Sequence, residues 1–270
     1  MKKNRRIRII CTCLAIVLFA SMAIASGSSK TTEKASVKIA DNDTKATEAK
    51  KETTAATEEE KKIEYEITNT TFTHYTNSLK REEYCGIVEI SNTGSSYLYL
   101  GSCSFDLEDD DGHLLQTDKM VTSAPDVIAP GEKGYFFNNG FIDEGVSLEK
   151  GINLVPNFTI EIAKKGKDAI VEYEVSDLDL RDSDYGLGVK VTGRVTNTTN
   201  ESTSSISVMV IAVFYDSNGK ILDIAHTYPD EMAPGAKTSF EVSTLMGNTE
   251  ISTKDVADYK VIARGTSYNW

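Results

Sequence analysis

The stretch Ala129-Pro-Gly-Glu-Lys-Gly-Tyr-Phe136 decides how this chain is organised, because it returns later as Ala233-Pro-Gly-Ala-Lys-Thr-Ser-Phe240. Pro followed by Gly sets a tight turn, and the closing Phe begins a strand that returns to a core. The flanking features recur in the same order, so that Gly112 matches Gly219. The chain is therefore a tandem repeat, and the motif is predicted to be a structural corner of the repeated fold.

Each copy shows the period-two alternation of a half-buried strand. The first copy opens with Ile63-Glu-Tyr-Glu-Ile-Thr68, and the second opens with Ile170-Val-Glu-Tyr-Glu-Val-Ser176. Alternating apolar and polar residues are typical of strands with one buried face. The dipeptides Asp111-Gly112 and Asn218-Gly219 then mark hairpins, because both residue types tolerate a positive φ.

The repeat is too long for a solenoid, whose units run about 20–50 residues. Six or seven short strands in about 100 residues, with almost no helical pattern, favour a β-sandwich. We therefore predict an all-β chain with sandwich domains at residues 63–167 and 168–270. The boundary at 164–168 is short, and we expect it to leave the modules close to end to end.

The second copy resembles the FxLYD family of immunoglobulin-like domains from bacterial envelope proteins. The resemblance is carried by Val191-Thr-Gly-Arg-Val-Thr-Asn197, by Ala212-Val-Phe-Tyr-Asp216, and by the stretch from Ala233 to Phe240. The first copy keeps part of the naming motif in Phe105-Asp-Leu-Glu-Asp109. The resemblance implies tandem immunoglobulin-like sandwiches outside a Gram-positive cell, and it carries over no functional residue.

The N-terminal residues 1–25 indicate an export signal. Five Lys and Arg residues precede an uncharged run that reaches Ala23-Ile24-Ala25. This is the pattern of a cleavable secretory signal peptide, although the run also approaches the ~20 residues of a membrane anchor. Residues 26–62 are rich in Ala, Thr, Lys and Glu and poor in apolar residues, so they predict a disordered tether.

The charge of the chain argues against nucleic acid as a partner. Its formal net charge is −12, and phosphate contacts need clustered Lys and Arg. Contact with a membrane is expected only through the N-terminal segment, if that segment is retained. We therefore expect an extracellular or surface-associated protein.

The acidic segment Asp106-Leu-Glu-Asp-Asp-Asp-Gly-His113 is the one candidate for a metal site. Clustered carboxylates suit Ca²⁺, and Asp109, Asp111 and Asp118 are the candidate ligands. The spacing departs from that of an EF-hand loop, and the second copy keeps the turn residues with less charge. A solvated hairpin tip is the alternative interpretation, and no cofactor is expected.

Cys85 and Cys103 are the only cysteines that follow the signal segment, and an oxidising exterior would allow them to pair. Pairing is expected if their strands form a direct hairpin. The repeat alignment favours the opposite outcome. It places Tyr84, Val88 and Ile90 on the core face, so that Cys85 turns outward while Cys103 turns inward.

The sequence contains few residue patterns that indicate catalysis. His74, His113 and His226 are scattered, and no nucleophile motif or phosphate loop accompanies them. Tyrosines on the predicted strands either pack within the sheets or line a sugar-binding face. They are Tyr65, Tyr84, Tyr97, Tyr99, Tyr173 and Tyr215.

We thus expect a non-enzymatic binding or spacer protein that presents two modules to an unknown surface protein or wall polymer. The alternative is an envelope sensor or ligand-binding protein that uses a weak Ca²⁺ site on the acidic hairpin.

Overall fold

The computed structural model describes residues 62–77, 80–184, 188–204, 207–244 and 250–265. The predicted signal at 1–25 and all of the predicted tether except Lys62 lie outside these ranges. Residues 57–270 form one compact unit. None of the described residues belongs to a helix with the length and apolar character needed to cross a membrane.

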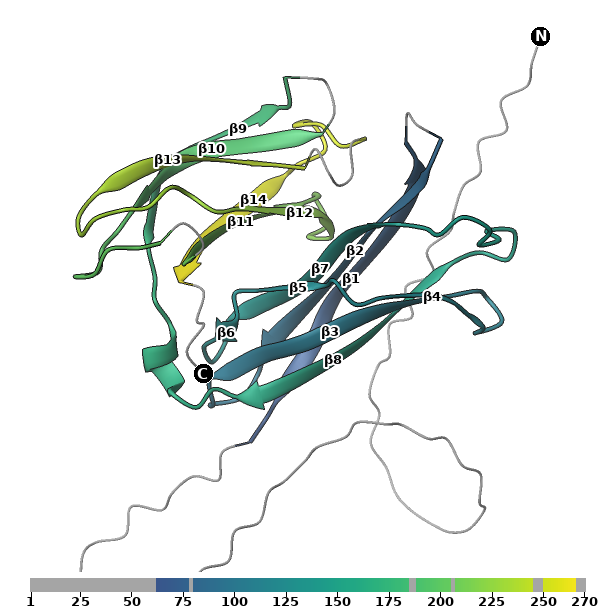
Figure 1. The fold of residues 1–270 in the computed structure, drawn as a ribbon, viewed down its shortest axis with the longest axis horizontal. Coiled ribbons are helices and arrows are strands. Elements are labelled where there is room, and N and C mark those ends of the chain that lie inside the picture. The colour runs from purple at the N-terminus through teal and green to yellow at the C-terminus, as the bar shows by residue number, and fades with distance from the viewer. Residues whose placement is uncertain (1–61, 78–79, 185–187, 205–206, 245–249, 266–270) are drawn as a thin grey trace, which may run out of the picture. The chain divides into compact units, whose positions relative to one another are not determined.

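The first half of this unit contains two antiparallel sheets (Figure 1). One sheet has the order β1 (Tyr65–Thr76), β2 (Glu82–Asn92), β7 (Lys133–Phe141) and β5 (Thr122–Ala124). The other has the order β4 (Leu114–Asp118), β3 (Leu98–Glu108) and β6 (Val127–Ile128), and β8 (Asn153–Ile162) also pairs with β3. These sheets are called sheet A and sheet B below.

The second half repeats this plan after the 3₁₀ turn η1 (Gly166–Ala169). Sheet D has the order β13 (Lys237–Ser243), β10 (Val189–Thr196) and β9 (Glu174–Asp182). Sheet C has the order β12 (Ile221–Thr227), β11 (Val208–Tyr215) and β14 (Asp258–Gly265). The all-β sandwich prediction is therefore confirmed, and sheets A and B correspond to sheets D and C.

Each sandwich has its own hydrophobic core. In the first, Tyr84, Val88 and Ile90 from sheet A pack against residues of sheet B such as Phe105. In the second, valines of β10 pack against β11, β12 and β14. The predicted core face of β2 is confirmed. Removing these apolar surfaces from water is the main stabilising contribution to each sandwich.

The repeated Ala-Pro-Gly stretch forms the same corner in both sandwiches, as predicted. Gly131 has φ +78° and Gly235 has φ +73°, a conformation that glycine adopts without steric cost. The N–H of Gly131 donates to the carbonyl oxygen of Asn92, and the N–H of Gly235 donates to that of Asn197, both at 2.9 Å. The corner therefore ties β2 to β7 and β10 to β13.

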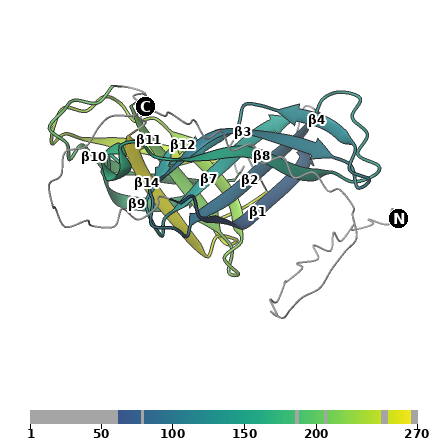
Figure 2. The same ribbon diagram turned by 90° about the horizontal axis from the view of Figure 1, so that it is seen from below.

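The expected end-to-end arrangement of the modules is wrong. Sheet A of the first sandwich packs face to face on sheet C of the second, with residues of both in one buried cluster. Figure 1 shows β11, β12 and β14 beside β5, β7 and β2, and Figure 2 shows β12 and β14 beside β7 after a 90° turn. A short linker permits this arrangement, and the buried apolar surface favours it.

Candidate functional site at the acidic turn and between the sandwiches

The acidic hairpin tip is organised by Asp109, the residue that follows β3. Its Oδ1 accepts hydrogen bonds from the backbone N–H groups of Asp111 and His113, each at 2.9 Å. Asp216 does the same in the second sandwich, accepting from Asn218 at 2.8 Å and Lys220 at 2.9 Å. These backbone hydrogen bonds lower the pKa of both carboxyl groups. The shared aspartate is therefore a turn-forming residue.

The structure brings together only part of the predicted metal set. Asp109, Asp111 and His113 offer atoms within 4.8 Å of one another. Asp111 pairs with Lys150, with 2.6 Å between Nζ and Oδ2. Ca²⁺ prefers six to eight oxygen ligands, so two carboxylates already engaged by a turn and a lysine fit it poorly.

The third predicted ligand, Asp118, lies in a different environment. Its Oδ2 accepts hydrogen bonds from the hydroxyl of Tyr84 and from the side-chain amide of Asn138, both at 2.8 Å. Asp118 thus satisfies a buried tyrosine at the margin of the first core. Sequence spacing groups Asp118 with the acidic tip, but the two lie at opposite ends of β4.

The two cysteines of the described residues are both free. They do not share a hairpin, because β2 belongs to sheet A and β3 to sheet B. Cys103 lies in the first core, as the repeat alignment indicated, while Cys85 lies on the other face of sheet A. There Cys85 meets the second sandwich, and its Sγ donates to Oδ1 of Asp223 at 3.5 Å. Burial raises the pKa of both thiols.

An apolar cluster joins sheet A to sheet C. Ile87, Tyr135 and Phe137 contribute from the first sandwich, and Met209, Ile211 and Val213 contribute from β11. Nearly all of these side chains are excluded from solvent. Burying one such side chain contributes about 1.5–3 kcal/mol, so the cluster holds the sandwiches as one body.

A buried carboxylate, Glu89, anchors polar contacts across this interface. It accepts from Lys133 Nζ at 2.8 Å and from the hydroxyl of Thr68 at 2.6 Å, both in the first sandwich. The hydroxyl of Tyr215, from the second sandwich, donates to Oε2 of Glu89 at 3.3 Å and lies 2.9 Å from the hydroxyl of Tyr135. Because a buried polar group is costly without partners, this network favours one relative placement of the two sheets.

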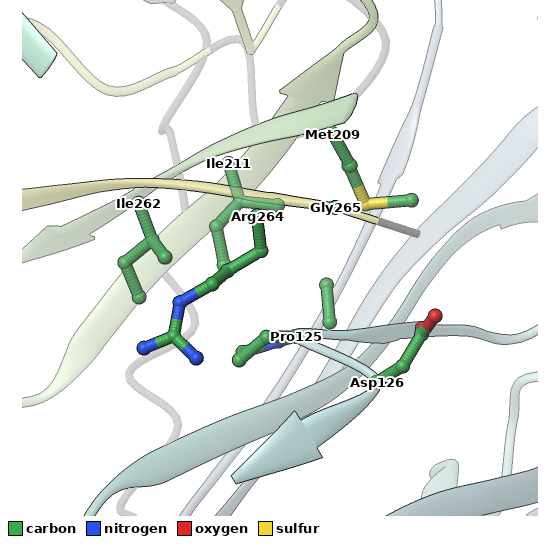
Figure 3. A pocket seen from close by; sticks show the side chains of 8 residues that line it. Pro125, Asp126, Met209, Ile211, Ile262, Arg264 and Gly265 are labelled. Carbon is green, nitrogen blue, oxygen red and sulfur yellow. The ribbon is translucent and has the colours of Figure 1, made fainter. Parts of the chain in front are cut away.

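One end of the interface lies at the turn that contains the cis Ala124-Pro125 peptide bond (Figure 3). Pro125 lies against Ile262 and Arg264 of β14, and the space between them holds only about 10 Å³. Nη2 of Arg264 lies 2.8 Å from Oε1 of Glu132, which belongs to the repeated corner, and 2.8 Å from Oε1 of Glu172. A space of this size has room for about one water molecule, so we assign no ligand to it.

The docking residues have polar equivalents in the other copy. Met209, Ile211 and Val213 on β11 correspond to Ser102, Ser104 and Asp106 on β3. Cys85, Ile87 and Glu89 on β2 correspond to Lys190, Thr192 and Arg194 on β10. The docking face of β11 is therefore apolar and that of β2 is buried, whereas the equivalent faces of β3 and β10 carry polar or charged residues.

This difference is a signal that sequence reasoning missed. The run Val208–Phe214 is apolar at every position, as expected for a strand that is buried on both faces. The strand β3 instead alternates buried and partly exposed residues. The three histidines lie on separate elements, namely β1, the acidic tip and β12.

No protein-family model matches this chain, and no curated protein matches it either.

Proposed function

We propose that this chain is an exported, surface-associated protein that acts by binding without catalysis and that presents its two sandwiches as one rigid unit. The face-to-face packing of sheet A on sheet C supports this most directly. A buried polar network inside an apolar interface holds both modules in a fixed relation. A fixed pair presents one continuous surface, and pre-organisation lowers the entropy lost when a partner binds.

The sequence supports the cellular part of the proposal. Residues 1–25 have the basic and apolar regions of a signal or anchor, and residues 26–62 have the composition of a tether. A tether of this kind gives the folded unit reach from a membrane or wall. The partner is then a surface protein or a wall polymer, and nucleic acid is disfavoured by the net charge of −12.

The proposal includes FxLYD-type immunoglobulin-like modules for both sandwiches. Supporting this assignment, the residues that carry the resemblance fall on β10, on β11 and at the repeated corner. The first copy, whose naming motif is less complete, forms the same corner and the same aspartate-centred turn. The Ca²⁺ sensor is the weaker alternative, because the acidic tip is explained by its turn.

Localisation and partner capture test the proposal together. The full chain with a C-terminal epitope is expressed in its source cells, and intact cells are treated with protease and with a membrane-impermeant crosslinker. We expect the epitope to be protease-accessible and to crosslink to one surface component. Retention of the epitope in the protected cytosolic fraction overturns the proposal. A matched chain lacking residues 1–25 is expected to stay inside and serves as the control.

A further inference from the structure

A groove opens where β7 of the first sandwich passes β12 of the second. Both sandwiches line it, with Thr122, Phe137 and Asn139 on one side and Ile224, His226 and Ser243 on the other. The groove holds about 260 Å³. Ligand pockets occur preferentially at domain interfaces, and those for drug-sized molecules begin near 300 Å³. The groove therefore suits a ligand of about one ring.

Aromatic rings from both sandwiches make one wall. The rings of Phe137 and His226 meet edge to face, with centroids 5.5 Å apart. The ring of Tyr228, which is not among the residues lining the groove, meets His226 edge to face at 5.7 Å. Phe137 is buried, whereas His226 and Tyr228 retain exposed surface. Aromatic ring faces carry partial negative charge and attract the weakly positive C–H groups of a saturated ring, and the exposed ring of His226 can make this contact.

The polar lining is uncharged. Asn139 is exposed, and its amide both donates and accepts hydrogen bonds, while Thr122 and Ser243 supply hydroxyl groups. Among the described residues that line the groove, none is Lys, Arg, Asp or Glu. Partial burial lowers the pKa of His226 below its ordinary value of 6.5, which favours the neutral imidazole. An uncharged groove in a chain with net charge −12 favours an uncharged ligand.

We infer that this groove binds a neutral sugar residue of a glycan. A pyranose presents C–H groups on one face and hydroxyl groups around its edge, which match an aromatic wall beside amide and hydroxyl groups. A peptide is less suited, because an extended segment needs a longer groove with unpaired backbone groups. The inference deepens the proposed function and rests on it for the setting in which the chain meets a glycan.

Nuclear magnetic resonance of the histidine side chains tests the inference on the full chain. The chain has three histidines, so the Hε1 signal of His226 can be assigned by its loss in His226→Gln. The probes are the neutral trimer of N-acetylglucosamine, maltotriose, the cationic trimer of glucosamine, and triglycine. We expect one or both neutral sugars to shift the His226 signal saturably and to leave His74 and His113 unchanged.

A substitution at the rim of the groove provides the second measurement. Asn139→Ala removes an exposed amide and is expected to weaken sugar binding at least tenfold without loss of folding. Asn157→Ala, on the opposite face of the first sandwich, is the matched control and should bind as the parent does. Failure of both neutral sugars to move His226, an unchanged affinity in Asn139→Ala, or a shift caused by triglycine alone overturns the inference.

The proposed function and the glycan inference can be refuted independently of each other. If the chain is surface-exposed and crosslinks to a partner but no sugar moves the His226 signal, the glycan inference is wrong and the proposed function stands. If a sugar binds the groove but the epitope remains in the cytosolic fraction, the proposed localisation is wrong and the groove assignment stands.

Discussion

The hydroxyl oxygens of Tyr135 and Tyr215 lie 2.9 Å apart, although the two residues belong to different sandwiches. Each ring is packed in the cluster between sheets A and C, and the pair extends to the carboxylate of Glu89. Ionising either hydroxyl places a second negative charge beside that carboxylate in a poorly solvated site. The interface is therefore expected to be sensitive to alkaline pH.

Stability is expected to fall as pH rises above 10. Burial raises the pKa of Tyr215 to about 12 and raises that of Tyr135 further, whereas an unfolded tyrosine titrates near 10. Because the pKa of Tyr215 is higher in the folded state than in the unfolded state, its stabilising contribution is complete below pH 10. That contribution is lost as the pH rises from about 10 to about 12. Urea denaturation at pH 9, 10 and 11 should show that the free energy of unfolding declines less steeply with pH in Tyr215→Phe than in the parent. Parallel declines in the two proteins would show that this tyrosine does not carry the effect.

Polar substitution of the docking face is expected to separate the sandwiches without unfolding them. The triple variant Met209→Ser, Ile211→Ser, Val213→Asp installs the residues found at equivalent positions of β3. It removes three buried side chains at about 1.5–3 kcal/mol each and leaves the core face of β11 unchanged. Far-UV circular dichroism should be retained, while the unfolding curve should split into two transitions. A single cooperative transition at the parent midpoint would contradict this prediction. Ser104→Ala, on sheet B outside the interface, is the control.

The buried asparagines at the repeated corners are expected to contribute equally to the two sandwiches. The Asn92 amide donates to the carbonyl oxygens of Ser96 and Ile128, at 2.8 and 3.2 Å, and the Asn197 amide donates to those of Glu201 and Met232, at 2.7 and 3.1 Å. Replacing either with Ala removes the donor from carbonyl groups of which at least one in each corner is buried, which costs about 1–3 kcal/mol.

Chemical denaturation of the Asn92→Ala and Asn197→Ala variants measures this loss. Asn200→Ala, an exposed change in the loop after β10, should stay within about 0.5 kcal/mol of the parent. A loss of unfolding free energy below about 0.5 kcal/mol in Asn92→Ala or Asn197→Ala would show that the corner does not depend on its asparagine.

Thiol labelling should report on docking and on core folding separately. Burial raises the pKa of Cys103 to about 12 and holds that of Cys85 well above its ordinary value, so both stay protonated at pH 8. Iodoacetamide followed by peptide mass spectrometry should find neither residue labelled until denaturant is added. In the triple interface variant, Cys85 should react while Cys103 remains protected. Labelling of Cys103 in the native parent would contradict its place in the core.

Calcium is expected to leave the melting temperature unchanged. Oδ1 of Asp109 accepts from two backbone N–H groups, its Oδ2 lies 3.1 Å from Nδ1 of His113, and Asp111 pairs with Lys150. Differential scanning calorimetry in about 1 mM Ca²⁺, the range of weak extracellular sites, compared with chelator checks this. An upward shift that disappears in Asp111→Asn would establish a metal site at the tip.

Local signals predicted much of each sandwich. The Pro-Gly corners, the Asp-Gly and Asn-Gly turns and the period-two strands depend on neighbouring residues, and they lie where the sequence placed them. The orientation of Cys103 followed from the repeat alone. Strand β1 continues beyond the alternating stretch that ends at Thr68 and reaches Thr76, because it pairs with β2 along its length.

The docking of the sandwiches depends on contacts between distant segments. Nothing near Ile211 indicates that its outward face will meet Ile87, since the two are joined only by the packing of complete sheets. The apolar run of β11 contained the signal, but a run of this kind also suits an ordinary buried strand. The groove at His226 was missed for the same reason, because it exists only after the sandwiches dock.

The two copies dock through different sheets, and this affects how further copies could add. The first copy docks through sheet A and the second through sheet C, which are not equivalent, so the contact is head-to-tail. Contacts of this kind do not close on themselves, and identical repeats would extend into an open-ended fibre. Here Lys190, Thr192 and Arg194 on sheet D and Ser104 and Asp106 on sheet B are charged or polar. Polar end faces of this kind disfavour the addition of a further member to the series.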